Sequence, residues 1–120
     1  MSRALKRLQQ LLGPGELRLD ERTRKEHAGD KWFATGMPEA VALPRSVAAV
    51  SRILKHASRN QIPVTARGAG FGYVGGCVPL RGGIALSLTR LRRIKEISGR
   101  DFVAVVQPGV ITATLQERVE

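Results

Sequence analysis

Apolar and polar residues alternate along the chain in patterns that predict short helices and strands. Near the N-terminus, four leucines recur at the spacing of one helical face, which predicts an amphipathic helix over residues 3–12, ended by the Gly-Pro-Gly segment 13–15. Residues 16–37 are polar and charged. We expect mostly irregular structure there, with Trp32 and Phe33 packed back onto the domain.

A strand, a helix and a second strand are predicted next. Residues 40–43 predict a short strand, and apolar positions in residues 47–59 recur at helical spacing, with Ser46 placed to cap that helix. Asn60 is expected to end the helix, and residues 62–66 predict the second strand. Such a unit predicts a right-handed βαβ crossover around a parallel pair of strands.

The last third of the chain is predicted to add two strands and a helix. Residues 84–88 predict a strand, residues 91–98 a short link, and residues 102–110 a strand that runs into a turn. Thr112 is placed to cap a final helix over residues 113–120. The mixture and order of these elements predict the α+β fold class.

The composition indicates one small domain, or part of a larger one. The 120 residues are 42% hydrophobic, and no apolar run approaches the roughly 20 residues that span a membrane. The N-terminus lacks the unbroken apolar stretch of a signal peptide. A single cysteine, Cys77, excludes an internal disulfide and indicates a cytoplasmic protein. We expect Cys77 to be a small buried side chain and assign no chemical role to His27 or His56.

The net charge of +10 is unevenly distributed. No Asp or Glu occurs between Ala40 and Lys95. A field of this kind attracts a polyanion, an acidic partner, a membrane surface or a phosphate-bearing cofactor. The alternative is a solvated basic surface, or one covered by a further part of the protein. The basic residues of this segment are Arg45, Arg52, Lys55, Arg59, Arg67, Arg81, Arg90, Arg92, Arg93 and Lys95.

A glycine-rich segment, residues 65–83, follows a predicted strand and contains seven glycines. Its G-x-G-x-x-G pattern begins at Gly70, but in a dinucleotide-binding fold that pattern opens a helix whose N-terminus meets the pyrophosphate. Pro79 and the glycines around it forbid such a helix. The acidic residue that should hold a ribose has only a poor candidate, Glu96, and the Gly-Lys-Ser/Thr of an NTPase P-loop is absent.

The sequence instead favours a glycine loop that binds an anion with its own backbone. Successive glycines let several amides point into one concavity and let the backbone approach a pyrophosphate closely. Arg67 adds positive charge at the start of the loop. A plain connector between strands is the alternative, although long loops in compact domains are usually functional or disordered.

Four segments in order resemble the FAD-binding domain of FAD-linked oxidases of the vanillyl-alcohol oxidase and p-cresol methylhydroxylase (PCMH) type. They are the Pro44-x-Ser46 helix start, IPVTARGAGFGYVGG, GGIALSL-x-RL and VVQPGV. The branch most resembled is that of D-lactate dehydrogenases and glycolate oxidase flavin subunits. The resemblance implies FAD as cofactor, with backbone amides of the glycine loop around its pyrophosphate. The residues it assigns to the cofactor are Arg67, Gly68, Ala69, Gly70, Phe71, Gly72, Gly75, Gly76, Pro108, Gly109 and Val110.

Phe71 departs from the pattern of this family. Many members carry Thr or Ser there, which can bond a phosphate, and some relatives carry a His that bonds covalently to the flavin. A phenylalanine side chain can do neither. We therefore predict non-covalent FAD.

The resemblance implies that a full-length parent oxidises a 2-hydroxy acid or related alcohol, with the flavin accepting the hydride. It also implies that residues 1–39 are a lead-in and residues 40–120 an incomplete FAD-binding domain. The rest of that domain and a substrate cap domain would lie beyond the chain. No catalytic residue or metal ligand is named here, and we expect the chain alone to be inactive.

The competing interpretation is a basic module that binds nucleic acid or an acidic partner. It rests on the acid-free segment alone, and such binding would fall steeply with salt. FAD binding through shape and amides would not, and we expect no nucleic-acid partner. A third alternative is a fragment that folds poorly because its strand edges are exposed.

Overall fold

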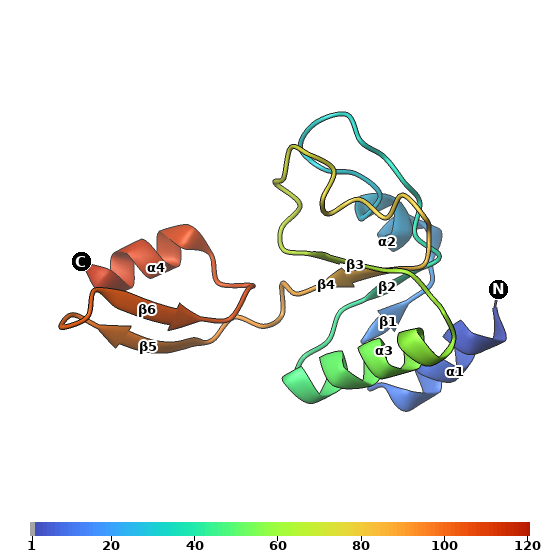
Figure 1. Cartoon of the computed structure of the whole chain (residues 1–120), viewed down its shortest axis with the longest axis horizontal. Coiled ribbons are helices and arrows are strands. Elements are labelled where there is room, and N and C mark those ends of the chain that lie inside the picture. The colour runs from blue at the N-terminus through green and yellow to red at the C-terminus, as the bar shows by residue number, and fades with distance from the viewer. Residues whose placement is uncertain (1) are drawn as a thin grey trace.

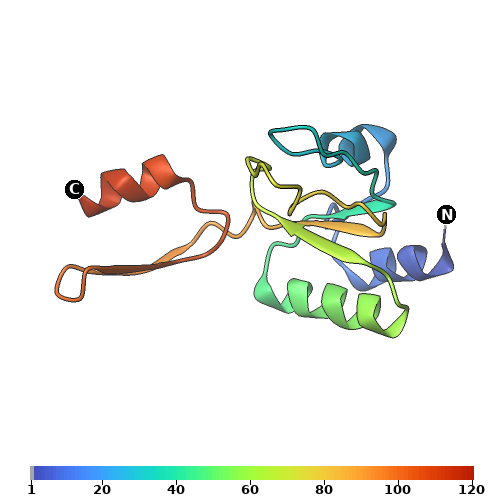
Figure 2. The same cartoon turned by 45° about the horizontal axis from the view of Figure 1, so that its top comes forward.

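The computed structural model describes residues 2–120 as a four-stranded sheet with a projecting hairpin and helix (Figure 1). Helices α1 and α3 lie on one face of the sheet, and α2 and the long loops lie on the other (Figure 2). This arrangement confirms the α+β class. The elements in chain order are α1 (Arg3–Leu11), β1 (Leu17–Arg18), α2 (Glu21–Glu26), β2 (Ala40–Ala42), α3 (Val47–Arg59), β3 (Val64–Arg67), β4 (Ile84–Ser87), β5 (Ile94–Ser98), β6 (Val103–Val106) and α4 (Thr112–Val119).

The sheet has the strand order β1-β2-β4-β3, so β4 lies between the two strands that α3 connects. Ala85 of β4 pairs in parallel with Val41 on one side and with Thr65 on the other. The predicted pairing of the strands around α3 is therefore wrong: they are parallel, but they are not neighbours. All four residues of β4 are buried, whereas β3 is partly exposed. The two fully buried strands, β2 and β4, thus occupy the interior of the sheet, and β3 is an edge.

The core forms where α1 and α3 pack against β2 and β4. Leu8, Ile53 and Ile84 have no exposed surface, and these residues come from α1, α3 and β4. Burial of such side chains contributes roughly 1.5–3 kcal/mol each. The predicted α3 is confirmed: Ser46 Oγ accepts from the backbone N–H of Ala49 at 3.1 Å, and Asn60 ends the helix.

Residues 16–37 are mostly irregular, as predicted, but they also contain two short elements that were not predicted, β1 and α2. Helix α2 begins because Asp20 accepts a hydrogen bond from the N–H of Thr23 at 3.0 Å. Lys25 and Glu21 form an ion pair one turn apart, at 3.0 Å. The predicted packing of the two aromatic residues is wrong, since Trp32 and Phe33 are 63% and 79% exposed.

Strands β5 and β6 form an antiparallel hairpin that projects from the sheet, with α4 beside it (Figure 1). The predicted link over residues 91–98 is thus wrong for Ile94–Ser98. The charged residues of this strand interrupt any apolar pattern, and the strand is largely exposed to solvent in this structure. The predicted cap at Thr112 is wrong as well, because Ile111 occupies the N-cap of α4 and no side chain caps it.

Candidate functional site

The glycine loop leaves the carboxyl end of β3 and returns to the start of β4. Gly70 and Gly75 have φ angles of +84° and +78°, which only glycine adopts readily. Among the hydrogen bonds of the described residues, none runs from the N–H groups of residues 68–74 to a protein acceptor. This row of free amides at the end of a strand suits anionic oxygens. The loop therefore fits a pyrophosphate-bearing cofactor.

Arg67 lies beneath this loop and is 7% exposed. Its Nη1 donates to the carbonyl oxygens of His27 and Gly29, at 3.0 and 3.2 Å. Its Nε is buried without a partner in the described part of the chain. A Cβ placed on Gly70 would collide with Nη2 of Arg67. The guanidinium thus puts positive charge directly under the loop while its donors hold the neighbouring backbone.

The Gln-Pro-Gly-Val turn packs against the end of β4 and the start of the glycine loop. The N–H of Gly109 donates to the carbonyl oxygen of Leu91 at 2.8 Å. A Cβ on Gly109 would lie 2.5 Å from the Leu88 oxygen and 2.8 Å from that of Thr89. A Cβ on Gly68 would lie 3.9 Å from the carbonyl oxygen of Pro108. Glycine at 109 is therefore required by this close backbone approach.

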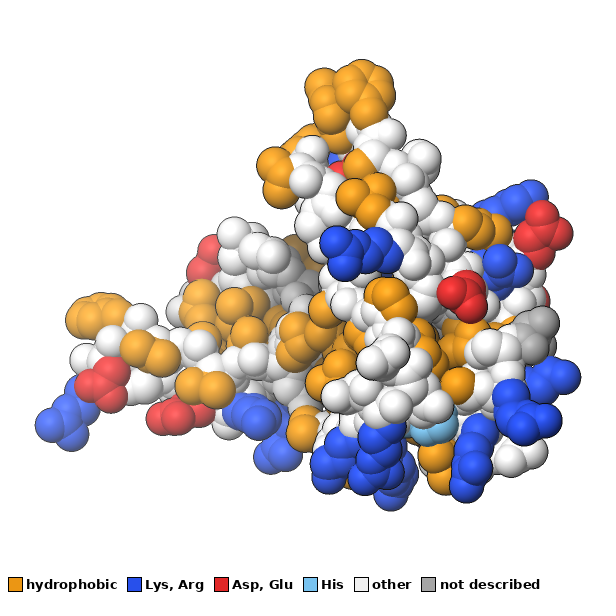
Figure 3. All heavy atoms as spheres, turned by 45° about the vertical axis from the view of Figure 1, so that its right-hand side comes forward, with side chains coloured by type: hydrophobic (Ala, Val, Ile, Leu, Met, Phe, Trp, Pro, Cys, Tyr) orange, Lys and Arg blue, Asp and Glu red, His pale blue; other side chains and the backbone are white. Residues whose placement is uncertain are grey.

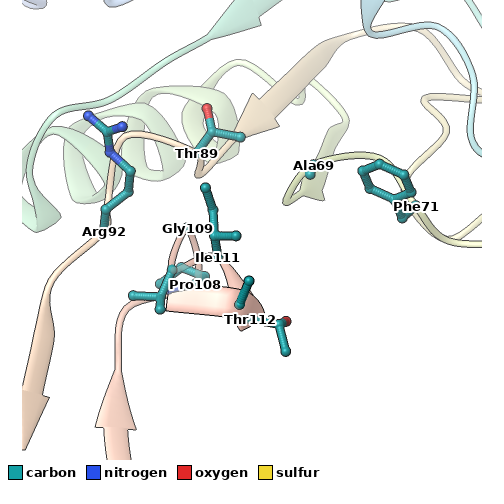
Figure 4. Close-up of a pocket in the computed structure, with 10 residues that line it drawn as sticks. Ala69, Phe71, Thr89, Arg92, Pro108, Gly109, Ile111 and Thr112 are labelled. Carbon is teal, nitrogen blue, oxygen red and sulfur yellow. The ribbon is translucent and has the colours of Figure 1, made fainter. Parts of the chain in front are cut away.

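A pocket of about 450 Å³ lies between the loop, the turn and the start of α4 (Figure 4). Five of the residues predicted to bind the cofactor line it: Ala69, Phe71, Pro108, Gly109 and Val110. The sequence interpretation predicted a helix near Thr112 but did not assign its start, or Arg92, to the site, because only the fold brings them beside the loop. The remaining lining residues are Thr89, Arg92, Ile111, Thr112 and Ala113.

Gly75 and Gly76 do not line this pocket. The N–H of Gly75 already donates to Oδ2 of Asp30 at 2.9 Å, so its amide is occupied. A Cβ on Gly76 would meet no described atom within 4 Å. These two glycines form the far arm of the loop rather than the wall of the pocket.

Several of the basic residues in the acid-free segment hold the fold together. Nη1 of Arg90 donates to the carbonyl oxygens of Gly15 and Leu43, at 3.1 and 2.9 Å. Burial lowers the pKa of Arg90. Nη1 of Arg45 donates to the carbonyl oxygen of Pro14 at 2.7 Å. Together with Arg67, these residues support backbone turns, whereas other Lys and Arg side chains gather along the lower edge of the molecule in Figure 3.

The two histidines and the cysteine also have structural surroundings. Nε2 of the buried His56 lies 2.7 Å from the carbonyl oxygen of Ala4 and joins α3 to α1. Nδ1 of His27 lies 2.7 Å from the oxygen of Thr23. The thiol of Cys77, predicted to be buried, is partly exposed. None of the described helices is long and apolar enough to cross a membrane.

Comparison with known proteins agrees with this geometry. A protein-family model described as an FAD binding domain matches residues 38–120. The glycolate oxidase subunit GlcD of Bacillus subtilis is 40% identical over 84 residues, which are 70% of this chain and 18% of that protein. A D-lactate dehydrogenase of Anaerostipes hadrus is 34% identical over 88 residues, which are 73% of this chain and 18% of that protein.

The fold is that of a PCMH-type domain. The solved structure of p-cresol methylhydroxylase with substrate bound aligns with a TM-score of 0.82 over 97% of this chain and 24% of its own, at 21% identity. The chain belongs to the family of FAD binding domains found in FAD-linked oxidoreductases. The cofactor of this family is FAD. The chain spans about a quarter or less of the length of the curated relatives that it matches.

Proposed function

We propose that this chain forms the pyrophosphate-binding wall of the FAD site in a flavin-dependent oxidoreductase that acts on a 2-hydroxy acid. The observation that carries the proposal is the row of unbonded amides in residues 68–74. These amides lie next to a pocket that is also lined by the turn at residues 108–110. When bound, FAD supplies the hydride-accepting chemistry, and the protein supplies binding and orientation.

The loop and the turn would contact different parts of the cofactor. The amides of residues 68–72 would hold the phosphate oxygens, with the guanidinium of Arg67 underneath. Pro108, Gly109 and Val110 would form the opposite wall of the pocket. The side chain of Phe71 lines the same pocket and is 66% exposed. It offers only carbon atoms, so this position contributes contact area and no bond to the flavin.

The substrate class rests on the relatives rather than on residues of this chain. Two of them are named for glycolate and D-lactate, both 2-hydroxy acids. A residue that takes the hydroxyl proton and one that binds the carboxylate are required for such a reaction. We assign neither role within residues 2–120. The oxidation itself is proposed for a protein of the length of these relatives.

The test is a titration of the 120-residue chain with FAD, followed by quenching of flavin fluorescence at low and high salt. We expect saturable binding that tolerates salt. The Gly72→Leu variant should abolish FAD binding, because its long side chain fills the space near the amides. The loop itself should keep its fold, since a Cβ at Gly72 has room, with Cys77 Sγ 3.9 Å away. Gly99→Leu is the matched control, since Gly99 lies in the distant hairpin turn with no described atom within 4 Å of its Cβ.

Binding that disappears steeply with salt would support the basic-module alternative instead. Equal FAD binding by the Gly72→Leu and wild-type chains would refute the assignment of the loop. A folded chain without any FAD binding would refute the proposal that these residues are sufficient for a site.

A further inference from the structure

A segment outside the matched domain forms hydrogen bonds to the glycine loop. Residues 27–36, here called the clamp segment, precede the family match at residues 38–120, and the two loops rise side by side in Figure 1. Oδ2 of Asp30 accepts from the N–H of Gly75 at 2.9 Å. The N–H of Lys31 donates to the carbonyl oxygen of Gly72 at 3.0 Å. The glycine loop is thus tied to the clamp segment at Gly72 and at Gly75.

Arg67 completes this connection from the other side. It extends from the end of β3, and its two hydrogen bonds reach the carbonyl oxygens of His27 and Gly29. The clamp segment is itself closed, because the N–H of Gly36 donates to the oxygen of Ala28 at 2.7 Å. A Cβ on Gly36 would lie 2.7 Å from the carbonyl oxygen of Pro79. The clamp segment therefore contacts the glycine loop through backbone as well as side chains.

The contacts of Asp30 leave the cofactor-facing amides free. Its Oδ1 accepts from the N–H of Trp32 at 2.8 Å, so both carboxylate oxygens are engaged. The amide that it occupies, that of Gly75, lies outside the pocket, whereas residues 68–74 keep theirs. The ammonium group of Lys31 lies 5.2 Å from the ring centre of Phe71, a residue that does line the pocket. The clamp segment thus connects to the pocket without competing for its donors.

We propose that Asp30 and Arg67 are positioning residues, which hold the glycine loop in the conformation that receives the cofactor phosphates. A loop with so many glycines loses more backbone freedom on ordering than ordinary sequence does. A protein that orders such a loop before binding retains that part of the binding free energy. The inference rests on the proposed function, and it assigns a cofactor-related role to Asp30, which precedes the matched domain at residues 38–120.

The test compares Asp30→Ala and Asp30→Asn in the full 120-residue chain. We expect Asp30→Ala to speed hydrogen exchange at the Gly75 amide and to weaken FAD binding by about tenfold or more, the scale of one lost charge-assisted hydrogen bond. Asp30→Asn keeps one of the two acceptor oxygens and should bind FAD with an affinity between those of Asp30→Ala and wild type. Asp101→Ala is the control, because Asp101 bonds Ser98 in an exposed turn of the hairpin.

Three outcomes separate the possibilities. Faster Gly75 exchange with unchanged FAD affinity in Asp30→Ala would overturn the positioning role, and so would equal loss of affinity in the Asn and Ala variants. A wild-type chain that is folded but binds no FAD would refute the proposal that these residues are sufficient for a site. In that case the exchange rate at Gly75 still decides whether Asp30 holds the loop. Arg67→Met, which removes both hydrogen bonds to the clamp segment but keeps a long side chain, is expected to speed exchange at Gly75 as Asp30→Ala does.

Discussion

Oε2 of Glu16 lies 2.9 Å from the backbone nitrogen of Arg45, although the two residues are 29 positions apart. The other oxygen, Oε1, accepts from the N–H of Gly13 at 2.8 Å. The hydrogen bond from Arg45 is the main cause that lowers the pKa of Glu16 below its ordinary value of 4.5, and burial opposes it. The carboxylate therefore joins the end of α1 to the start of α3.

This lowered pKa predicts a loss of stability in acid. A carboxyl group with a depressed pKa in the folded state stabilises the protein fully above its unfolded pKa, near 4.5, and loses that contribution as the pH falls further. Urea unfolding between pH 7 and pH 3 should show this decline. The Glu16→Gln chain should be less stable at pH 7 and should show a shallower decline. Glu26→Gln, which removes only an exposed pair with Arg22, should keep the wild-type slope.

Ser46 is expected to stabilise α3 as its N-cap. Ser46→Ala removes the acceptor for the N–H of Ala49 and should lower the free energy of unfolding by about 1 kcal/mol. Denaturant unfolding measures this change. Ser51→Ala is the control, because Ser51 lies on the exposed side of the same helix. It should leave the stability equal or slightly higher, and an equal loss in both variants would contradict the cap.

Gly109 is expected to tolerate no side chain. Its Cβ would approach the carbonyl oxygens of Leu88, Leu91 and Thr89 to within 2.5–2.8 Å, and overpacking of this kind costs about 1–3 kcal/mol. Thermal unfolding of Gly109→Ala should therefore show a clear loss. Gly99→Ala should be neutral or stabilising by a few tenths of a kcal/mol to about 1 kcal/mol, since it limits the unfolded chain without a contact to displace.

Two glycines of the same loop should respond differently to alanine. Gly70→Ala should disturb the loop even without cofactor, because its φ is +84° and its Cβ would strike Arg67. Gly72→Ala has room for its Cβ and should leave the free chain unchanged. Backbone amide chemical shifts of residues 66–77 are the measurement. Equal shifts in both variants would contradict the position of Arg67 beneath Gly70.

The flavin should be released whole when the loaded protein is denatured. Phe71 presents only a phenyl ring to the pocket, and carbon of that kind forms no bond to the flavin. Acid precipitation followed by centrifugation should leave all FAD in the supernatant. Flavin that stays with the pellet after washing would contradict the prediction.

The regular elements could be predicted wherever one physical signal dominated. Helix α3 combined a Ser cap with apolar positions at helical spacing, and its bounds were predicted as they are observed. Strand β5 was not predicted, because it is exposed to solvent and carries charged residues, so no alternation of apolar and polar residues indicates a strand there. The place of β4 between β2 and β3 was not predicted, because the order of strands in the sequence does not reveal their order in the sheet.

For the site, the sequence predicted the segments that line the pocket but not the residues that hold these segments in place. The loop at residues 68–72 and the turn at residues 108–110 were predicted from glycine chemistry and from the resemblance. Ala69 and Phe71 of the loop line the same pocket as the turn. Asp30 was not predicted, since one aspartate in a polar stretch carries no local signal. Its partner, Gly75, lies 45 positions away. Only the fold brings such a pair into contact.

The central place of β4 governs the order in which the protein can be assembled during its synthesis. Both parallel ladders of the sheet contain β4, yet β4 is the last of the four strands to leave the ribosome. Until Ser87 has emerged, β2 and β3 have no strand between them and can form neither ladder. The antiparallel pair of β1 and β2 and the helices α1, α2 and α3 can form earlier, but the four-stranded sheet is complete only after β4 has entered between β2 and β3.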